Sequence, residues 1–286
     1  MIDNRLLKYY PTYATEDGFL KLDSKGFKVV EGKNDFKFFD FLHCSEGIYF
    51  LKATPKPIAD AEVLMGQIYN LLGLNGAVYI PAKLDEKSSH IHVVSNNVIN
   101  KNYIYACDQI EVMRKTTGKL FALELPQRKI ENVVDYSKII SNEAMAKQIL
   151  MRVADVATKN HDRNTSNFAY KVEKGIITDL ATYDNGACGT YPYNNSYFYY
   201  HDFQNSFSMS DFQFLLTLRD NENVQDFVSF NEMAEKIGGI NVSNIASDIK
   251  QTTNYNIEQQ LIDSTARQMD YVANALVCSE EELVNI

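Results

Sequence analysis

Three oxygen-bearing side chains that could bind a metal ion lie within one short stretch of the chain, Lys159–Gly186. Asp162 and Asn167 stand in a polar loop with the spacing Asp-x₄-Asn, and Asp184 begins a second polar cluster. Carboxylate and carboxamide oxygens are hard ligands that suit Mg²⁺, which takes one or two carboxylates together with phosphate oxygens. A further aspartate that does not touch the metal could orient a hydroxyl nucleophile. Together these groups have the layout of a phosphoryl-transfer site.

The residues between the two polar clusters predict the element that brings the clusters together. Two short apolar runs, Phe168–Val172 and Ile176–Leu180, are joined by a turn that contains Gly175, a residue suited to a left-handed position. The strands of such a hairpin run out and back, so Asn167 and Asp184 should lie close together although 17 positions separate them (184 − 167). In the alternative interpretation this is an ordinary surface hairpin between turns, because Asn, Asp and Gly all favour turns.

A helix is expected immediately before the polar loop, over Asn142–Lys159, where apolar residues form a stripe and Ser141 or Asn142 can cap the start. This helix would deliver the loop to the site. His161 is interpreted as a structural residue under the loop. Arg163 could pair with a carboxylate or with a phosphate.

The residues HDRNTSNF (161–168), followed by TYDNG (182–186), resemble the catalytic core of the HipA-type serine/threonine kinases. They are also similar to the related phosphatidylinositol-kinase-like and secretory-kinase-like atypical kinases. In that group an Asp-x₄-Asn catalytic loop precedes a Tyr-Asp or Ile-Asp-Asn-Gly metal motif. The resemblance implies that Asp162 is the catalytic base, Asn167 a metal ligand and Asp184 the main metal ligand. Outside this stretch the chain matches the family in order and spacing only.

Length, charge and composition limit the classes of protein to consider. A chain of 286 residues can form one large domain or two lobes, and its 45% hydrophobic and 23% charged residues are typical of a soluble globular protein. A net charge of −9 without a Lys/Arg-dense run argues against direct nucleic-acid binding. The sequence has no apolar run long enough for a membrane span, no signal-peptide core and four scattered cysteines without a C-x₂-C pair. We therefore expect a cytoplasmic protein, delivered to a host cell if it is an effector.

The first part of the chain has the pattern of an antiparallel sheet and one helix. The helix is expected over about Ala59–Leu74, with Gly73 and Gly76 at its end. The expected strands are Gly18–Leu22, Phe27–Val30, Phe36–Phe39, Ile48–Lys52, Ala77–Pro81, His90–Val94 and Ile104–Cys107. This pattern is compatible with the β-rich N-lobe of a kinase.

A lysine at a strand end and a glutamate in the following helix form a candidate phosphate clamp. In kinases such a pair holds the α- and β-phosphates of ATP, so Lys52 and Glu62 are the candidates, with Asp60 as an alternative partner unless it caps the helix. Alternatively both side chains are separately solvated, as most Lys and Glu are. Two turns, Asp23–Gly26 and Glu31–Asn34, could cover a nucleotide. Neither contains Gly-x-Gly-x-x-Gly and each also suits an ordinary hairpin, so the phosphate loop stays unassigned.

The apolar segment Gly118–Leu125, which ends at Pro126, stands where the hinge of a two-lobed kinase would lie. By position alone we expect its backbone groups to meet the adenine of ATP. The candidate residues are Phe121, Leu123 and Leu125.

After Gly186 the chain continues as an aromatic and polar stretch, Ala187–Phe207, with no visible period. It is interpreted as an ordered activation-type or substrate-facing loop. The helices expected after it are Ser210–Arg219, Phe230–Ile237, Val242–Lys250 and Ile257–Val277. The chain is therefore predicted to be an α+β protein with a two-lobed, protein-kinase-like fold, in which residues 1–125 form a β-rich N-lobe and residues 126–286 a helical C-lobe.

The expected function is phosphoryl transfer from ATP with Mg²⁺. The resemblance favours a Ser or Thr hydroxyl of a protein as acceptor, a role as toxin or effector, and an antitoxin-like regulator as partner. Three alternatives remain open: a lipid or small-molecule kinase of the same fold, a nucleotide-binding regulatory pseudokinase, and a nucleotidylating enzyme that transfers adenylate.

Overall fold

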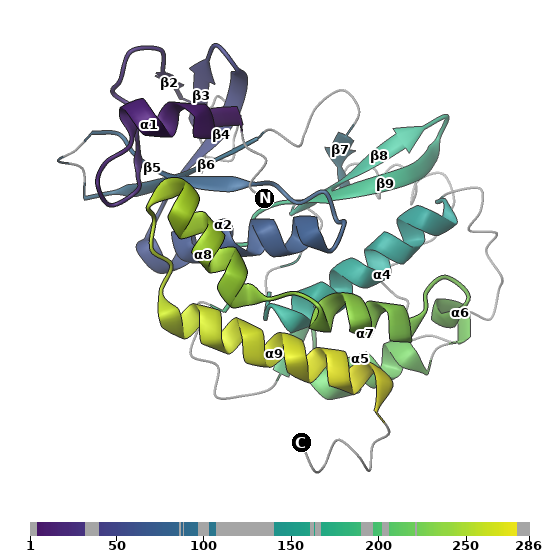
Figure 1. Ribbon diagram of the computed structural model, residues 1–286. Helices are drawn as coiled ribbons and strands as arrows, with labels where there is room; N and C mark the ends of the chain where they lie inside the picture. Colours follow the sequence, from purple (N-terminus) through teal and green to yellow (C-terminus); the bar gives the residue numbers. More distant parts are fainter. Residues whose placement is uncertain are drawn as a thin grey trace.

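The computed structural model describes residues 5–31, 40–85, 87, 89–96, 103–106, 140–160, 163, 167–189, 197–201, 206–220 and 222–278. A sheet with one long helix forms the N-terminal part, and helices dominate the C-terminal part (Figure 1). None of the described helices is long and apolar enough to cross a bilayer.

Among the described residues, six strands form the N-terminal sheet in the order β1-β5-β6-β4-β3-β2. The pair β1–β5 is parallel and the other pairs are antiparallel. The strands are β1 Leu20–Lys21, β2 Lys28–Val30, β3 Asp40–Cys44, β4 Gly47–Thr54, β5 Tyr79–Lys83 and β6 Ile91–Asn96. Six of the expected strands thus correspond to strands of the structure, one of them in the smaller sheet described below, while the run Phe36–Phe39 lies outside the described residues.

Alternation along the strands gives the sheet two apolar faces. Leu51 and its partner Val94 face one core, which the short helices η1 (Arg5–Tyr9) and α1 (Tyr10–Tyr13) cover. The residues next to Leu51 and Val94 in their strands, such as Val93, face the opposite side of the sheet, where α2 packs (Figure 1). The position that follows Leu51, Lys52, therefore belongs to the α2 side of the sheet.

Helix α2 spans Lys56–Leu71, one turn earlier than the sequence predicted. Pro57 stands in its first turn, where the backbone N–H that proline lacks would have no partner within the helix. The chain leaves the helix through Gly73, whose φ of +82° is a conformation that glycine adopts at low cost.

The hairpin expected from the sequence is present. Strands β8 (Phe168–Glu173) and β9 (Ile176–Thr182) pair antiparallel, and Lys174 and Gly175 between them have φ values of +53° and +82°. Positive φ at both central residues is the mark of a type I′ turn, which matches the twist of the flanking strands.

A third strand, β7 (Tyr103–Tyr105), pairs with β8 rather than with the large sheet. The chain therefore passes from the large sheet to the hairpin sheet between Asn96 and Tyr103. The expected hinge Gly118–Leu125, and with it a boundary near residue 125, falls within 107–139, outside the described residues.

Helix α4 (Asn142–Ala157) precedes the polar loop as predicted, and the Ser141 side chain caps it by accepting a hydrogen bond from the Ala144 amide at 3.2 Å. The later helices are α5 Asp211–Arg219, α6 Glu222–Gln225, α7 Phe230–Gly238, α8 Val242–Thr253 and α9 Gln259–Val277. Four of these were expected, and the single turn of α6 was not. An α+β protein with an N-terminal β-sheet and a helical C-terminal part, the kinase-like layout, is thus confirmed.

The aromatic stretch after the second polar cluster differs from the expectation of a loop. Strands β10 (Tyr197–His201) and β11 (Ser206–Ser210) pair antiparallel there. The alternation Ser-Phe-Ser-Met-Ser in β11 is the pattern of a strand. Most of it lies beyond Phe207, where the expected loop ended, so it was not part of that interpretation.

Candidate active site

Lys52 and Glu62 form an ion pair between the sheet and helix α2. The distance from Lys52 Nζ to Glu62 Oε1 is 3.0 Å. The Glu62 side chain is completely buried (0% exposed), and its Oε2 accepts a hydrogen bond from the backbone amide of Asn185 at 2.8 Å. These side chains are in contact and not separately solvated, and the contact reaches the second polar cluster.

Asp60, the alternative partner of Lys52, lies on another side of α2. Its carboxylate contacts Lys56 Nζ at 2.8 and 2.7 Å and the hydroxyl of Tyr255 at 2.5 Å. No side chain caps the N-terminus of this helix, so Asp60 is not a cap either. Between the two acidic residues, Glu62 is the one that pairs with Lys52.

Lys52 also contacts a second carboxylate, that of Asp184. Asp184 directly follows Tyr183 beyond the end of β9, and its backbone amide donates a hydrogen bond to the hydroxyl of Tyr79 at 2.8 Å. Its φ of +54° is left-handed, a conformation that costs a non-glycine residue energy and persists where the surroundings impose it. The ammonium therefore joins a buried carboxylate to one whose side chain is 35% exposed.

Burial and charge act in opposite directions on this pair. Burial alone would lower the pKa of the Lys52 ammonium, but the carboxylates of Glu62 and Asp184 outweigh it and hold the pKa above its ordinary value. Burial raises the pKa of the Glu62 carboxyl to about 7, against the opposing effect of Lys52. Glu62 therefore changes its charge close to neutral pH.

We predict that Glu62→Gln changes how stability depends on pH. The pKa of Glu62 lies above the ordinary 4.5, so the folded state keeps its proton longer than the unfolded chain. The stabilisation from Glu62 is full below pH 4.5 and is lost as pH rises through about 7. The free energy of unfolding of the wild type minus that of Glu62→Gln should fall by about 1–3 kcal/mol over this range, measured by urea unfolding.

The matched control for this measurement is Glu232→Gln, the same substitution at an exposed position of α7. Its difference from the wild type should vary much less with pH. A flat profile for Glu62→Gln would contradict the raised pKa.

Arg163 is buried at the centre of the polar loop and connects the two polar clusters. Its Nη1 donates to the carbonyl oxygens of Asn167 at 2.7 Å and Tyr183 at 2.8 Å. Its Nη2 donates to Asn185 Oδ1 at 2.7 Å, and its Nε to Asp155 Oδ1 of helix α4 at 3.1 Å. Of the two partners that the sequence left open, carboxylate or phosphate, the described contacts are with a carboxylate.

The sequence reasoning missed two residues that support the site, Asp155 and Tyr69. Asp155 is completely buried and also accepts a hydrogen bond from the Tyr69 hydroxyl at 2.6 Å. The Arg163 guanidinium lies 5.3 Å from the centre of the Tyr69 ring. An available signal was the aspartate within the apolar run Val153–Ala157, since a charge there must find a buried partner.

The hairpin brings Asn167 beside the second polar cluster. Its carbonyl oxygen accepts a hydrogen bond from the Tyr183 amide at 3.2 Å, one step beyond the last strand pair, so Asn167 opposes the residue before Asp184. Asp162 lies outside the described residues, although its neighbours Asn160 and Arg163 are placed and buried.

Of the expected nucleotide site, the structure describes one turn in full, the other turn in part, and the adenine contacts not at all. The turn Asp23–Gly26 connects β1 and β2, which lie at opposite edges of the sheet, so it is not a hairpin turn. Glu31–Asn34 belongs to the connection between the paired strands β2 and β3, which re-enters the sheet opposite Leu51. Residues 32–39 of that connection are outside the described part. So are the candidate adenine contacts Phe121, Leu123 and Leu125.

The oxygen donors of Asp184 and Asn167 fit Mg²⁺ by their chemistry. Among the described residues no group of three or more His, Cys, Asp or Glu side chains could hold a metal ion. One carboxylate and one carboxamide are donors of the kind that Mg²⁺ accepts, because this ion takes its other ligands from water and phosphate.

Solved structures match most of this chain at low sequence identity. Kinase CtkA of Helicobacter pylori, described as proinflammatory, matches with a TM-score of 0.49 and 14% identity over 92% of this chain and 98% of its own. HipA of Shewanella oneidensis MR-1, in a complex of the toxin–antitoxin system HipA, HipB and operator DNA, matches with a TM-score of 0.47 and 10% identity over 92% of this chain and 66% of its own. Choline kinase LicA of Streptococcus pneumoniae gives a TM-score of 0.23 and 12% identity over 87% and 95%.

No protein-family model matches the sequence, and neither does any curated protein. HipA, whose family the catalytic stretch resembles, is among the matched structures.

Proposed function

We propose that this chain transfers the γ-phosphoryl group of ATP to a Ser or Thr hydroxyl of a protein. The observation that carries the proposal is the ammonium of Lys52 held between Glu62 and Asp184. These three residues come from a strand, a helix and the end of a hairpin. A structural ion pair needs only one counter-ion, whereas this lysine has a buried carboxylate on one side and a half-exposed one on the other.

The buried carboxylate would fix the lysine, and the half-exposed one would exchange with the ligand. Glu62 would keep Lys52 in place when the non-transferred phosphates of ATP bind to the ammonium. Asp184 would then be released from the lysine and, with Asn167, hold Mg²⁺. The metal, when bound, supplies positive charge that neutralises the phosphate oxygens.

Asp162 has the role of general base in this proposal, which follows the resemblance of its loop. Its carboxylate accepts the proton of the acceptor hydroxyl while the hydroxyl oxygen forms a bond to the γ-phosphorus. The bond from that phosphorus to the bridging oxygen of ADP breaks, and ADP leaves. The protein performs little covalent chemistry, so catalysis depends on positioning and on stabilising charge.

The remaining nucleotide contacts and the lobe division are proposed by position. Backbone groups of Phe121, Leu123 and Leu125 would meet the adenine, and the lobes would divide near residue 125. Because β7 pairs with β8, the chain leaves the large sheet between Asn96 and Tyr103, and this is the alternative position for the boundary between the lobes.

We predict that Lys52→Met lowers kcat/KM for ATP by about 10²–10³-fold, because the variant loses the cation that meets the phosphates. The measurement is the initial rate of ADP formation at varied ATP concentration. Lys171→Met is the matched control, since Lys171 is also a strand lysine paired with a glutamate, Glu173, at 2.7 Å, but at the surface. An unchanged kcat/KM in folded Lys52→Met would remove this residue from the nucleotide site.

The resemblance to HipA-type kinases supports a role as toxin or effector under the control of an antitoxin-like regulator. A panel of protein, lipid and small-molecule acceptors with γ-labelled ATP tests the acceptor class. We expect the label on Ser or Thr of a protein acceptor. The intact mass of that acceptor should increase by one phosphoryl group. Label in a small molecule alone, an added adenylyl group, or bound ATP that is never consumed would each overturn the proposed activity.

A further inference from the structure

Helix α2, which carries Glu62, is held on another side by the segment between α8 and α9. We call this segment, Asn254–Glu258, the latch. It contacts Asp60, whose side chain is 1% exposed. Asp60 Oδ1 accepts a hydrogen bond from the Tyr255 hydroxyl at 2.5 Å, and Oδ2 accepts one from the Glu258 amide at 3.2 Å.

Lys56, one turn before Asp60, completes the contact between α2 and the latch. Its ammonium contacts both Asp60 oxygens and donates to the carbonyl oxygen of Asn256 at 3.0 Å. It also lies 4.9 Å from the centre of the Tyr255 ring. Asp60 thus has an ionic partner and hydrogen-bond donors on both oxygens, an arrangement that offsets the cost of burying the carboxylate.

The latch is itself seated against the N-terminal part of the chain. Gly18 has a φ of +84°, and a Cβ at this position would lie 2.3 Å from the backbone nitrogen of Tyr255. The Tyr255 ring meets Phe19 edge to face, with ring centres 5.2 Å apart. Tyr255 is 1% exposed, so the latch cannot shift without opening this packing.

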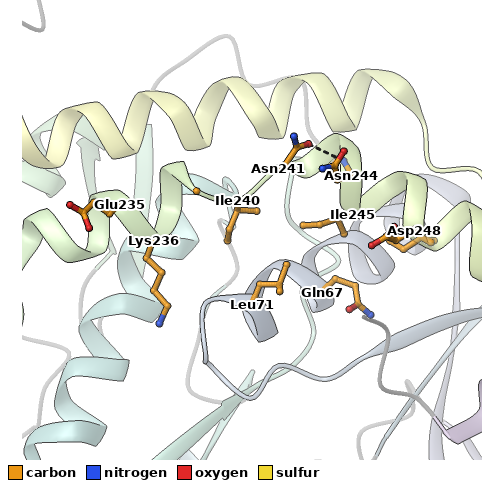
Figure 2. A pocket seen from close by; sticks show the side chains of 11 residues that line it. Gln67, Leu71, Glu235, Lys236, Ile240, Asn241, Asn244, Ile245 and Asp248 are labelled. Atoms are coloured by element: carbon orange, nitrogen blue, oxygen red, sulfur yellow. Dashed lines mark hydrogen bonds between the residues drawn. The ribbon is translucent and has the colours of Figure 1, made fainter.

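Toward the other end of α2, the Tyr69 hydroxyl bonds to Asp155 of α4 at 2.6 Å. A cleft of about 480 Å³ separates the last turns of α2 from α7 and α8, and Figure 2 shows Leu71 facing Ile240 and Ile245 across it. The Leu71 side chain is 51% exposed. The latch and the bond from Tyr69 to Asp155 are thus two buried contacts between α2 and the C-terminal part of the chain.

The first turns of α2 also touch the second polar cluster. A Cβ at Gly186 would lie 2.6 Å from Ile58 Cγ2, and the Asn185 amide bonds to Glu62 at 2.8 Å. Ile58 and Glu62 flank Asp60 by two residues on either side. One rigid turn of helix thus stands between the latch and the candidate active site.

We propose that Asp60 and Tyr255 are positioning residues, which fix α2 so that Glu62 holds Lys52. The expected effect on catalysis rests on the proposed phosphotransferase function. The expected effect on the position of α2 rests on the packing alone. This role of Asp60 and Tyr255 implies that this chain places its own α2 helix through a segment almost 200 positions downstream (255 − 60 = 195).

The test uses Tyr255→Phe in the full chain, with hydrogen exchange at the Asn185 amide as the first readout. This amide bonds to Glu62, so it reports whether α2 stays in place even without catalysis. We expect exchange there to become about tenfold faster, and kcat/KM for ATP to fall about tenfold, because a charge-assisted hydrogen bond is lost. Exchange within β8 and β9 should stay as in the wild type.

Tyr103→Phe is the matched control, because it also removes a tyrosine hydroxyl from an aspartate, Asp179, at 2.9 Å. It should leave exchange at Asn185 unchanged. If Tyr255→Phe does not fold, Asp60→Asn is judged by the same two readouts. Equal exchange at Asn185 in the latch variant and in Tyr103→Phe would overturn the inference. A wild type without transfer activity would refute the proposed function alone, since the exchange result still decides the role of the latch.

Discussion

Replacing Asp184 with asparagine should reduce phosphoryl transfer from ATP by at least about a thousandfold. Asparagine keeps the size of the side chain but supplies no negative charge to a metal ion. A reaction that depends on charge neutralisation at the phosphates loses most of its acceleration when the ion is lost. The measurement is the initial rate of label transfer from γ-labelled ATP at saturating Mg²⁺.

The control for Asp184→Asn is the same substitution at Asp179, in strand β9 of the same hairpin. Asp179 bonds to Lys147 at 2.8 Å and to Tyr103 at 2.9 Å, away from Lys52. Asp179→Asn should retain most of the activity. A folded Asp184→Asn protein that transfers phosphate at the wild-type rate would refute the assignment of the metal site.

Replacing Arg163 with methionine should lower the free energy of unfolding by about 3–5 kcal/mol. The substitution removes the nearer guanidinium partner of the buried Asp155 carboxylate, at 3.1 Å, and leaves Arg152 at 3.8 Å; breaking a buried ion pair in this way costs about this much. It also removes the donors to the carbonyl oxygens of Asn167 and Tyr183, which fix the polar loop to the hairpin. Urea unfolding followed by circular dichroism measures the change.

Arg219→Met is the matched control for Arg163→Met. Arg219 pairs with Asp220 at 3.2 Å and bonds to the Cys278 carbonyl at 2.7 Å, but at a partly exposed position. Its loss should cost no more than about 1 kcal/mol. An equally small cost at Arg163 would show that the buried network contributes little to the stability of the loop.

The sequence predicted those parts of the fold that local chemistry determines. Ser141 caps α4, and Gly175 permits the type I′ turn that starts the hairpin. The register that places Asn167 opposite Tyr183 needs in addition an irregularity between Lys171 and Val172, which shifts the strand pairing by one residue and which no sequence signal predicted.

Contacts between distant segments were not predictable in the same way. The bond between Tyr255 and Asp60 joins residues 195 positions apart, and no periodicity or turn signal refers to it. Sequence left Asp60 and Glu62 as alternatives for Lys52, because both stand near the start of the same helix. Only the packed helix separates them, with Glu62 turned to the site and Asp60 to the latch.

A crystal structure with Mg²⁺ and a non-hydrolysable ATP analogue tests the central claim most directly. We expect Lys52 to keep Glu62 and to exchange Asp184 for oxygen atoms of the non-transferred phosphates. Asp184 and Asn167 should then share the metal ion with the nucleotide. A nucleotide bound elsewhere, with Lys52 still on Asp184, would contradict the account.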